Sequence, residues 1–194
     1  HRRRGILTRL MRRHLDEARG AGFAVSALWA TEAAIYGRFG YGTASHCGAI
    51  ALECSHARFR APSPAPGSFR LLEEPEARAT FPAIWDRVRA VTPGMMTRSD
   101  VWWEIRRTGD YDPSACPLQR VLLEIDGRPE GYALYRIDDK VALASGVIQI
   151  NVSVMEAVAT SPRATHLLWR YLCELDLVHT LSAAGLPMTH PLLH

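Results

Sequence analysis

The sequence predicts a mixed α/β (α+β) protein in which two halves repeat a plan of strand, loop and helix. In the first half, an apolar 3.6-residue periodicity begins at Leu7 and stops at Gly20, and an alternating run follows at 46–54. In the second half, apolar runs at 118–125 and 131–137 flank a turn and indicate a β-hairpin. Strand and helix signals therefore occur in both halves.

The first half contains four predicted elements after its opening helix. The apolar run at 23–30 predicts a buried strand. Thr31 is expected to cap a short helix with Glu32 in its first turn, and a glycine-rich turn at 37–42 ends that helix. The alternating run at 46–54 predicts a further strand.

The proline-rich stretch 61–68 is the predicted boundary between the halves. After it we expect a strand at 69–72 and a helix that begins near Thr80, so that Pro82 falls in its first turn. A second helix is expected at 100–107. The apolar positions of the first of these helices are Phe81, Ile84, Trp85 and Val88.

The remaining elements of the second half are a hairpin turn, a strand and a helix. The turn is expected at 126–130 and the strand at 148–157. Ser161-Pro162 opens the last predicted helix, because proline is favoured at the first helical position. The apolar face of that helix consists of Leu168, Tyr171, Leu172 and Leu175. The loop at 159–164 takes the place of the first half's Arg/Gly loop but has no glycine, so we interpret the second half as a degenerate copy.

Bulk composition argues against several classes of protein. Hydrophobic content is 47% and the net charge is +3, both ordinary for a globular protein. Lys140 is the single lysine, and such an arginine bias does not by itself predict nucleic-acid binding. No apolar run approaches the roughly 18 residues of a membrane helix. The scattered cysteines fit reduced thiols in a cytoplasmic protein, and His46 and Cys47 do not converge into a metal site.

Arg2, Arg3, Arg4 and Gly5 stand directly before the first predicted helix and form a candidate anion site. The amides that begin a helix lack partners within it and carry partial positive charge. Gly5 has no Cβ to keep a phosphate away, and arginines add forked donors. A solvated arginine-rich helix start is the alternative interpretation of this pattern.

Tyr36 is the candidate proton donor, one predicted strand after the anion site. A phenol has a pKa of about 10 and can protonate a leaving thiolate within hydrogen-bond reach. Alternatively, Tyr36 and its aromatic neighbours only pack at a helix end. The combination of an anion site and a tyrosine favours a phosphate-bearing cofactor and a proton donor.

These residues resemble the GNAT superfamily of acetyltransferases, and more narrowly the enhanced-intracellular-survival (Eis) family of aminoglycoside N-acetyltransferases. The run Tyr-Gly-Arg-Phe-Gly-Tyr-Gly at 36–42 is the most specific motif. The resemblance covers nearly the whole chain. It continues through 131–136, 168–172 and 176–178.

The resemblance implies the roles of individual residues. Tyr36 would be the general acid, and Thr31 and Glu32 would border the pantetheine arm. Leu7 occupies a slot that is usually glycine or alanine in the superfamily, but the Eis family accepts leucine there. The acetyl-CoA diphosphate would be lined by Arg3, Arg4, Gly5, Ile6, Leu7 and Thr8.

The resemblance also implies a domain plan of tandem GNAT-type folds. We expect the C-terminal part of the catalytic domain at 1–60, a linker at 61–68, and a degenerate GNAT-like domain at 69–194. The family adds N-terminal strands and a sterol-carrier-like C-terminal domain that carries the general base. We therefore expect this chain to be an internal fragment, inactive alone, of a homo-hexameric cytoplasmic protein.

The predicted function is acetyl-CoA-dependent N-acetylation of a polycationic small molecule, such as an aminoglycoside, or of lysine side chains. Trp29 either walls the acceptor pocket or belongs to the core. The first alternative is a non-catalytic CoA-binding or assembly module. The second is a basic nucleic-acid-binding fragment, which the leading prediction excludes.

Overall fold

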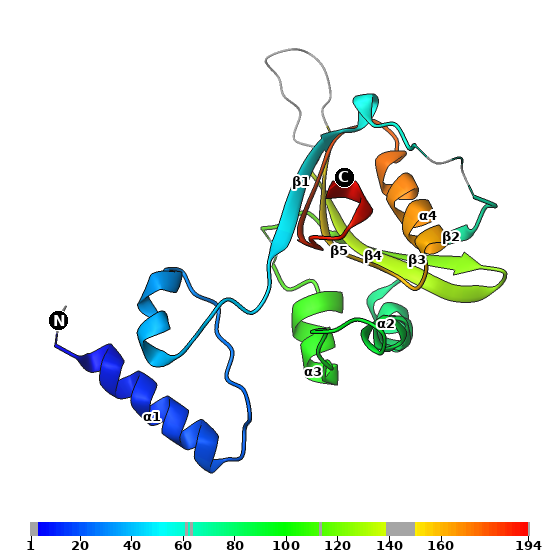
Figure 1. The fold of residues 1–194 in the computed structure, drawn as a ribbon. Coiled ribbons are helices and arrows are strands. Elements are labelled where there is room, and N and C mark those ends of the chain that lie inside the picture. Colours follow the sequence, from blue (N-terminus) through cyan, green and yellow to red (C-terminus); the bar gives the residue numbers. More distant parts are fainter. Residues whose placement is uncertain (1–3, 61, 63, 113, 139–149, 194) are drawn as a thin grey trace. The chain divides into compact units, whose positions relative to one another are not determined.

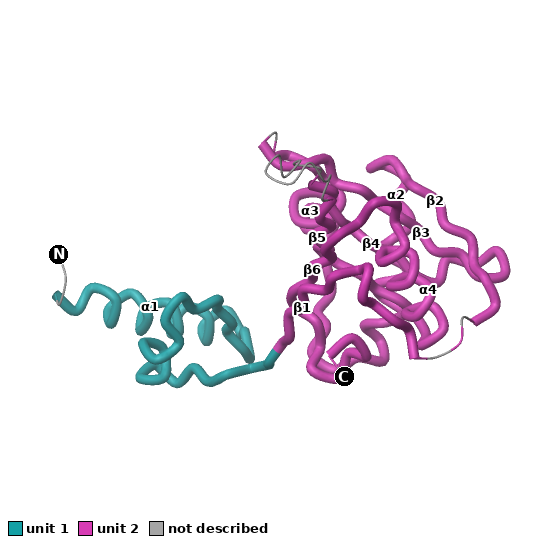
Figure 2. The backbone as a smooth tube through the Cα atoms, turned by 90° about the horizontal axis from the view of Figure 1, so that it is seen from above, with its two compact units in different colours: residues 1–46 teal, residues 47–194 magenta. Residues whose placement is uncertain are grey.

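The computed structural model describes residues 4–60, 62, 64–112, 114–138 and 150–193. The chain divides into two compact units, residues 1–46 (unit 1) and residues 47–194 (unit 2) (Figure 2). The division falls before the first strand, because that strand pairs within the sheet of unit 2. The domain boundaries predicted at 60 and 69 stay a prediction.

Unit 1 is built from one long helix and two short 3-10 helices. Its elements are α1 (Ile6–Gly20), η1 (Ala33–Ile35) and η2 (Gly37–Phe39). The helix begins and ends close to the predicted positions. No residue of these three elements is fully buried, so unit 1 has only a thin apolar interior.

The strand predicted at 23–30 is wrong, since this segment has no regular secondary structure. Phe23, Val25 and Trp29 are 69%, 81% and 94% exposed. An apolar run becomes a strand only when another strand supplies hydrogen bonds, and residues 4–46 form no strand. The interpretation of Trp29 as a core residue is wrong for the same reason.

The cap predicted at Thr31 is also wrong. The residue at the N-cap of η1 is Glu32, and no side chain caps this helix. A single 3-10 turn exposes fewer unpaired amides than an α-helix, so it offers little for a threonine hydroxyl to bind.

Unit 2 is a six-stranded mixed sheet in the order β1-β6-β5-β4-β3-β2. The strands are β1 (Cys47–Glu53), β2 (Ser68–Leu71), β3 (Leu118–Ile125), β4 (Arg128–Asp138), β5 (Ile150–Ala159) and β6 (Val178–Pro187). Only the β5–β6 pair is parallel, and it is joined through α4 (Pro162–Cys173); the other pairs are antiparallel. The α/β fold class is therefore confirmed.

Helices cover both faces of the sheet (Figure 1). On one face α4 buries Leu168 and Leu172 against alternate residues of the strands. On the other, α2 (Glu74–Arg89) and α3 (Asp100–Trp103) pack against residues that include Leu122 and Tyr132. Phe81 of α2 stacks on Tyr132 with ring centroids 4.3 Å apart. The two faces of β3 and β4 are thus both apolar, as buried strands require.

Two helix predictions in unit 2 need correction. The α2 helix begins at Glu74 rather than near Thr80, so Pro82 lies inside it. Pro82 lacks the amide of a regular helical hydrogen bond, but Ala77 and Phe81 are fully buried and hold the helix on the sheet. The helix predicted at 100–107 is α3 followed by a π-helical segment, η4 (Glu104–Thr108).

Unit 2 also contains the short 3-10 helices η3 (Cys54–His56) and η5 (Pro191–Leu193).

The hairpin turn between β3 and β4 is tighter than predicted. Asp126 and Gly127 both have positive φ, 54° and 72°, as in a two-residue type I′ turn. Strand β5 follows the prediction where it is described, and residues 148 and 149 lie outside the described residues.

Candidate functional site

The N-terminus of α1 has the backbone geometry of an anion site. Gly5 is the N-cap residue with φ 70° and ψ 11°, in the left-handed region that favours glycine. An added Cβ at Gly5 would meet nothing within 4 Å. The first amide bonded within the helix is that of Arg9, which donates to the Gly5 carbonyl at 3.1 Å. The amides of Ile6, Leu7 and Thr8 precede it, and no side chain caps them.

The side chains around this N-terminus add to its positive character. The first turn of α1 contains no acidic residue, so nothing in that turn neutralises the helix dipole. Ile6 and Leu7 are 42% and 37% exposed, and Thr8 is half-buried. Arg4 is described and exposed, whereas Arg3 lies outside the described residues. The predicted anion site therefore has a suitable backbone.

Tyr36 lies between the two 3-10 helices of unit 1 and is half-buried. Its carbonyl accepts from the amides of Phe39 at 2.9 Å and Tyr41 at 3.4 Å, closing a tight turn. Gly40 ends that turn with φ 88°. The Tyr36 ring meets the Tyr41 ring edge to face, with centroids 6.2 Å apart. The backbone hydrogen bonds fix the position of the Tyr36 backbone, and the ring contact places the Tyr36 side chain against Tyr41.

A chain of polar side chains connects this turn to α1. His14 Nε2 lies 3.1 Å from Ser26 Oγ, which lies 2.9 Å from Tyr41 Oη. Ser26 belongs to the segment wrongly predicted as a strand. His14 is about 12 Å along the helix axis from Ile6, given 1.5 Å per residue. Three separate segments of unit 1 are thereby joined.

Sequence reasoning missed this network. His14 falls on the same helical face as Leu7 and Ala18, and Ser26 interrupts the apolar run at 23–30. These two polar side chains were the available signal, and the fold joins His14 to Tyr41 through Ser26.

Thr31 and Glu32 are both exposed and directly precede η1. The Glu32 carbonyl accepts from the Ile35 amide at 3.1 Å, so both residues are on the same turn system as Tyr36. Their role beside the pantetheine arm stays a prediction.

The equivalent helix start in unit 2 is closed by the chain's own groups. Ser161 is the N-cap of α4, and its Oγ accepts from the Ala164 amide at 3.1 Å. Pro162 removes another amide from the first turn. Thr160 donates its hydroxyl to the Glu130 carboxylate, which Arg87 Nη2 also contacts at 2.6 Å. The α4 start therefore has a side-chain cap and one amide fewer than a regular first turn.

A metal site and a membrane-spanning helix are two further features to consider in the described residues. Over the described residues, no group of three or more His, Cys, Asp or Glu side chains could hold a metal ion. The helices of the same residues include none with the length and apolarity needed to cross a bilayer.

Comparison with known families fits this geometry. A family model described as "Acetyltransferase (GNAT) domain" matches residues 94–194, and a second model with the same description matches residues 1–44. The chain belongs to the GNAT acetyltransferase family. The two matches fall on different halves of the chain, so both halves carry features of GNAT domains.

Sequence relatives support an Eis-like member of the GNAT family. The chain is 35% identical over 196 residues to "N-acetyltransferase Eis" of Mycobacterium tuberculosis, covering 98% of the chain and 45% of the relative. An "Uncharacterized N-acetyltransferase" of Streptomyces avermitilis is 35% identical over 207 residues, 100% of the chain and 48% of the relative. The chain thus spans about half the length of these relatives.

Solved structures agree with this assignment. The crystal structure of Eis1 from Mycobacterium abscessus superposes with a TM-score of 0.79 at 34% identity, covering 100% of this chain and 47% of Eis1. A GCN5-related N-acetyltransferase from Anabaena variabilis, at 14% identity and a TM-score of 0.75 over 94% of this chain and 44% of that protein, shows the same fold. The resemblance to Eis and the GNAT superfamily is confirmed.

Proposed function

We propose that this GNAT chain contributes the acetyl-CoA site and the general acid of an Eis-like N-acetyltransferase. The acceptor would be an amine of a polycationic small molecule, such as an aminoglycoside, or a lysine side chain. The single observation that carries the proposal is the uncapped, glycine-started N-terminus of α1 in the same unit as Tyr36.

The donor set at α1 suits a diphosphate. Gly5 leaves the backbone accessible, and the amides of Ile6, Leu7 and Thr8 are oriented along the helix axis toward any bound anion. Arg3 and Arg4 would add charge-assisted hydrogen bonds. Bound acetyl-CoA would supply an activated thioester, and Thr31 and Glu32 would border its pantetheine arm.

Tyr36 would act on the leaving group. As the amine nitrogen bonds to the thioester carbonyl carbon, the C–S bond breaks and the Tyr36 hydroxyl gives its proton to sulfur. The ring contact with Tyr41 limits where that hydroxyl can point. The proton lost by the amine would go to a general base.

The acceptor, the homo-hexamer and the cytoplasmic location rest on the likeness to Eis. Trp29 is 94% exposed in unit 1, which leaves it available as a wall of the acceptor pocket.

The test uses the natural protein that contains this chain, with Tyr36→Phe. Thiol release in the presence of acetyl-CoA and an aminoglycoside should fall by about 100-fold or more, since general acids contribute roughly 10²–10⁴. Acetyl-CoA affinity, measured by isothermal titration, should stay unchanged. Near-normal turnover would remove Tyr36 from the acid role.

The same titration, combined with a product assay, distinguishes the enzyme from the non-catalytic alternative. Acetyl-CoA binding by the unmodified protein without acetylated amine after hours would favour a non-catalytic CoA-binding or assembly module. Absence of acetyl-CoA binding would contradict both proposals.

A further inference from the structure

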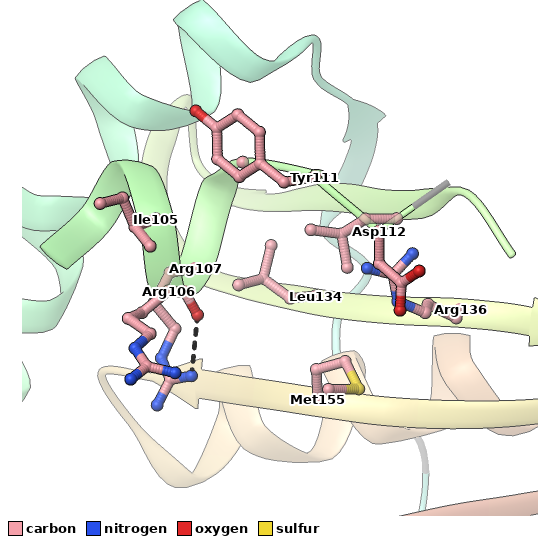
Figure 3. Close-up of a pocket in the computed structure, with 10 residues that line it drawn as sticks. Ile105, Arg106, Arg107, Tyr111, Asp112, Leu134, Arg136 and Met155 are labelled. Carbon is pink, nitrogen blue, oxygen red and sulfur yellow. Dashed lines mark hydrogen bonds between the residues drawn. The ribbon is translucent and has the colours of Figure 1, made fainter. Parts of the chain in front are cut away.

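Unit 2 contains a surface pocket on the sheet face that α2 and α3 share (Figure 3). Its volume of about 450 Å³ lies within the roughly 300–1,000 Å³ of small-molecule sites. The side chains that line it come from η4, the loop after it, β3, β4 and β5. They include Ile105, Arg106, Arg107, Leu118, Leu134 and Met155.

The first irregularity that shapes the pocket is the π-helical segment η4. The Gly109 amide donates to the Glu104 carbonyl at 2.9 Å, five residues back, and buried Thr108 donates its hydroxyl to Trp103 at 3.1 Å. Such segments are rare and concentrate at functional sites. This one places Arg106 and Arg107 together on one side of the pocket (Figure 3).

The second irregularity is a β-bulge in β5. Leu134 pairs with Glu156 and Tyr135 pairs with Val154, which leaves Met155 as the extra residue. A bulge redirects side chains and is common beside binding sites. Here Val154 packs on the α4 side, Glu156 faces the α3 side, and Met155 is 55% exposed at the pocket.

The η4 end of the pocket has excess positive charge. Glu156 accepts two hydrogen bonds from Arg98, at 2.8 and 2.7 Å, and another from Tyr132 Oη at 2.7 Å. Arg107 Nε lies 3.0 Å from the same carboxylate, yet this buried nitrogen makes no hydrogen bond of acceptable angle. One carboxylate therefore serves two guanidinium groups. The exposed Arg106 has its guanidinium carbon over the Trp102 ring, 6.0 Å from the ring centroid.

The middle of the pocket is apolar and partly uncovered. Leu118 and Leu134 are buried and form the floor, and Leu134 and Met155 lie between the arginines of η4 and Arg136 (Figure 3). Ile105 is 58% exposed at the rim. Exposed apolar groups gathered around one hollow are typical of a binding surface.

The opposite end of the pocket is electrostatically satisfied. Arg136 contacts Asp110 at 2.7 Å and donates to the Cys116 carbonyl. Asp112 accepts from the amide and the hydroxyl of Ser114, at 3.0 and 2.6 Å. A ligand's charge would therefore be drawn to the η4 end, where the pairing is incomplete.

We propose that this pocket binds a small amphipathic anion. Its carboxylate or sulfonate head would bind the exposed guanidinium of Arg106, and its aliphatic or aryl body would cover Leu134 and Met155. The site is independent of the acetyl-CoA site proposed for unit 1, since every lining residue belongs to unit 2.

The test compares three probes with one apolar body and different heads: octanoate, octanol and octylammonium. Each is titrated calorimetrically into the natural protein with coenzyme A at saturating concentration, so that any nucleotide site is already filled. Octanoate should bind about tenfold more tightly than octanol, because a charge-assisted hydrogen bond adds to the shared apolar contact. Octylammonium should bind most weakly. Equal affinity of octanoate and octylammonium would overturn the proposal.

Variants then locate the site. Arg106→Gln should reduce octanoate affinity roughly five- to tenfold and leave octanol unchanged, whereas Met155→Ala should weaken both ligands. Arg170→Gln is the matched control, an ion-paired arginine on α4 that does not line the pocket. All three positions are at least partly exposed, so folding should be preserved. Unchanged octanoate affinity in Arg106→Gln would refute the assignment.

Discussion

The N-termini of α1 and α4 begin two helices of one chain, each in a half that a GNAT family model matches, and they differ in what satisfies their amides. At α1, Gly5 has a left-handed backbone and no side chain caps the first turn. At α4, Ser161 caps the helix, Pro162 removes a donor, and Glu130 lies against Thr160 beside the cap. Among the described residues, the start of α1 therefore leaves more backbone donors without a side-chain cap than the start of α4 does. The comparison shows that a helix start becomes a ligand site when the chain leaves it unsatisfied.

Gly5→Ala should have the largest effect on this contrast. The new Cβ would enter the space through which a diphosphate approaches the amides, and we expect acetyl-CoA affinity to fall by on the order of tenfold or more. Isothermal titration of the natural protein measures this. Gly22→Ala is the matched control, since Gly22 also has positive φ, 80°, and open space around it. Equal losses in both variants would indicate strain in α1 rather than a lost site.

The number of acetyl-CoA molecules bound per chain tests whether the N-terminus of α4 binds a second molecule. We expect one, and Ser161→Gly should not add a second, because Pro162 still removes a first-turn amide and the Glu130 carboxylate still lies against Thr160 just before the cap, where it would repel a diphosphate. A stoichiometry of two in either protein would contradict the comparison.

Arg4→Gln should weaken acetyl-CoA binding less than Gly5→Ala, by roughly threefold to fivefold, because one charged donor is lost while the backbone donors stay. The salt dependence of binding should become shallower. Arg128→Gln, an exposed arginine of unit 2, is the control and should leave acetyl-CoA binding unaltered.

Ser161→Ala should leave acetyl-CoA binding unchanged and lower stability by about 1 kcal/mol, the usual value of an N-cap hydroxyl. Urea unfolding followed by tryptophan fluorescence measures it, since Trp169 is buried in α4. A loss of acetyl-CoA affinity with unchanged stability would reverse the roles assigned to the two helix starts.

The rate at which the thiol of Cys173, the last residue of α4, is modified should show the smallest and most local effect. Burial, followed by the nearby Cys54 thiol, raises the pKa of Cys173 to about 12. Because the raised pKa keeps the Cys173 thiol protonated at pH 8, iodoacetamide should modify exposed Cys47 first, and the Cys173 rate should stay lower than the Cys47 rate at pH 8 and pH 9. Peptide mass spectrometry measures both, and Ser161→Ala should speed only Cys173. Equal rates at pH 8 would contradict this burial.

Local sequence signals predicted those elements whose partners are also local. Gly20 and Gly22 end α1 as expected, Asp126-Gly127 makes the β3–β4 turn, and Ser161-Pro162 starts α4. Each depends on backbone preferences of one to three residues, so the chain order alone contains the required information.

Elements that depend on distant partners were predicted less well. The run at 23–30 has strand composition but no strand beside it, and Pro82 lies inside a helix because buried residues on both sides hold that helix on the sheet. The network of His14, Ser26 and Tyr41 joins three segments and has no local pattern.

The sequence by itself determined the family, the α/β class, the glycine that opens α1 and the position of Tyr36, because these depend on residue identity and short spacing. The contact of the Glu130 carboxylate with Thr160, thirty residues away in the chain and next to the α4 cap, depends on the tertiary structure. The tertiary structure also decided that η4 and the bulge at Met155 enclose a pocket. Both outcomes depend on which strands become neighbours, and that pairing is fixed by burial of the whole sheet rather than by any local preference.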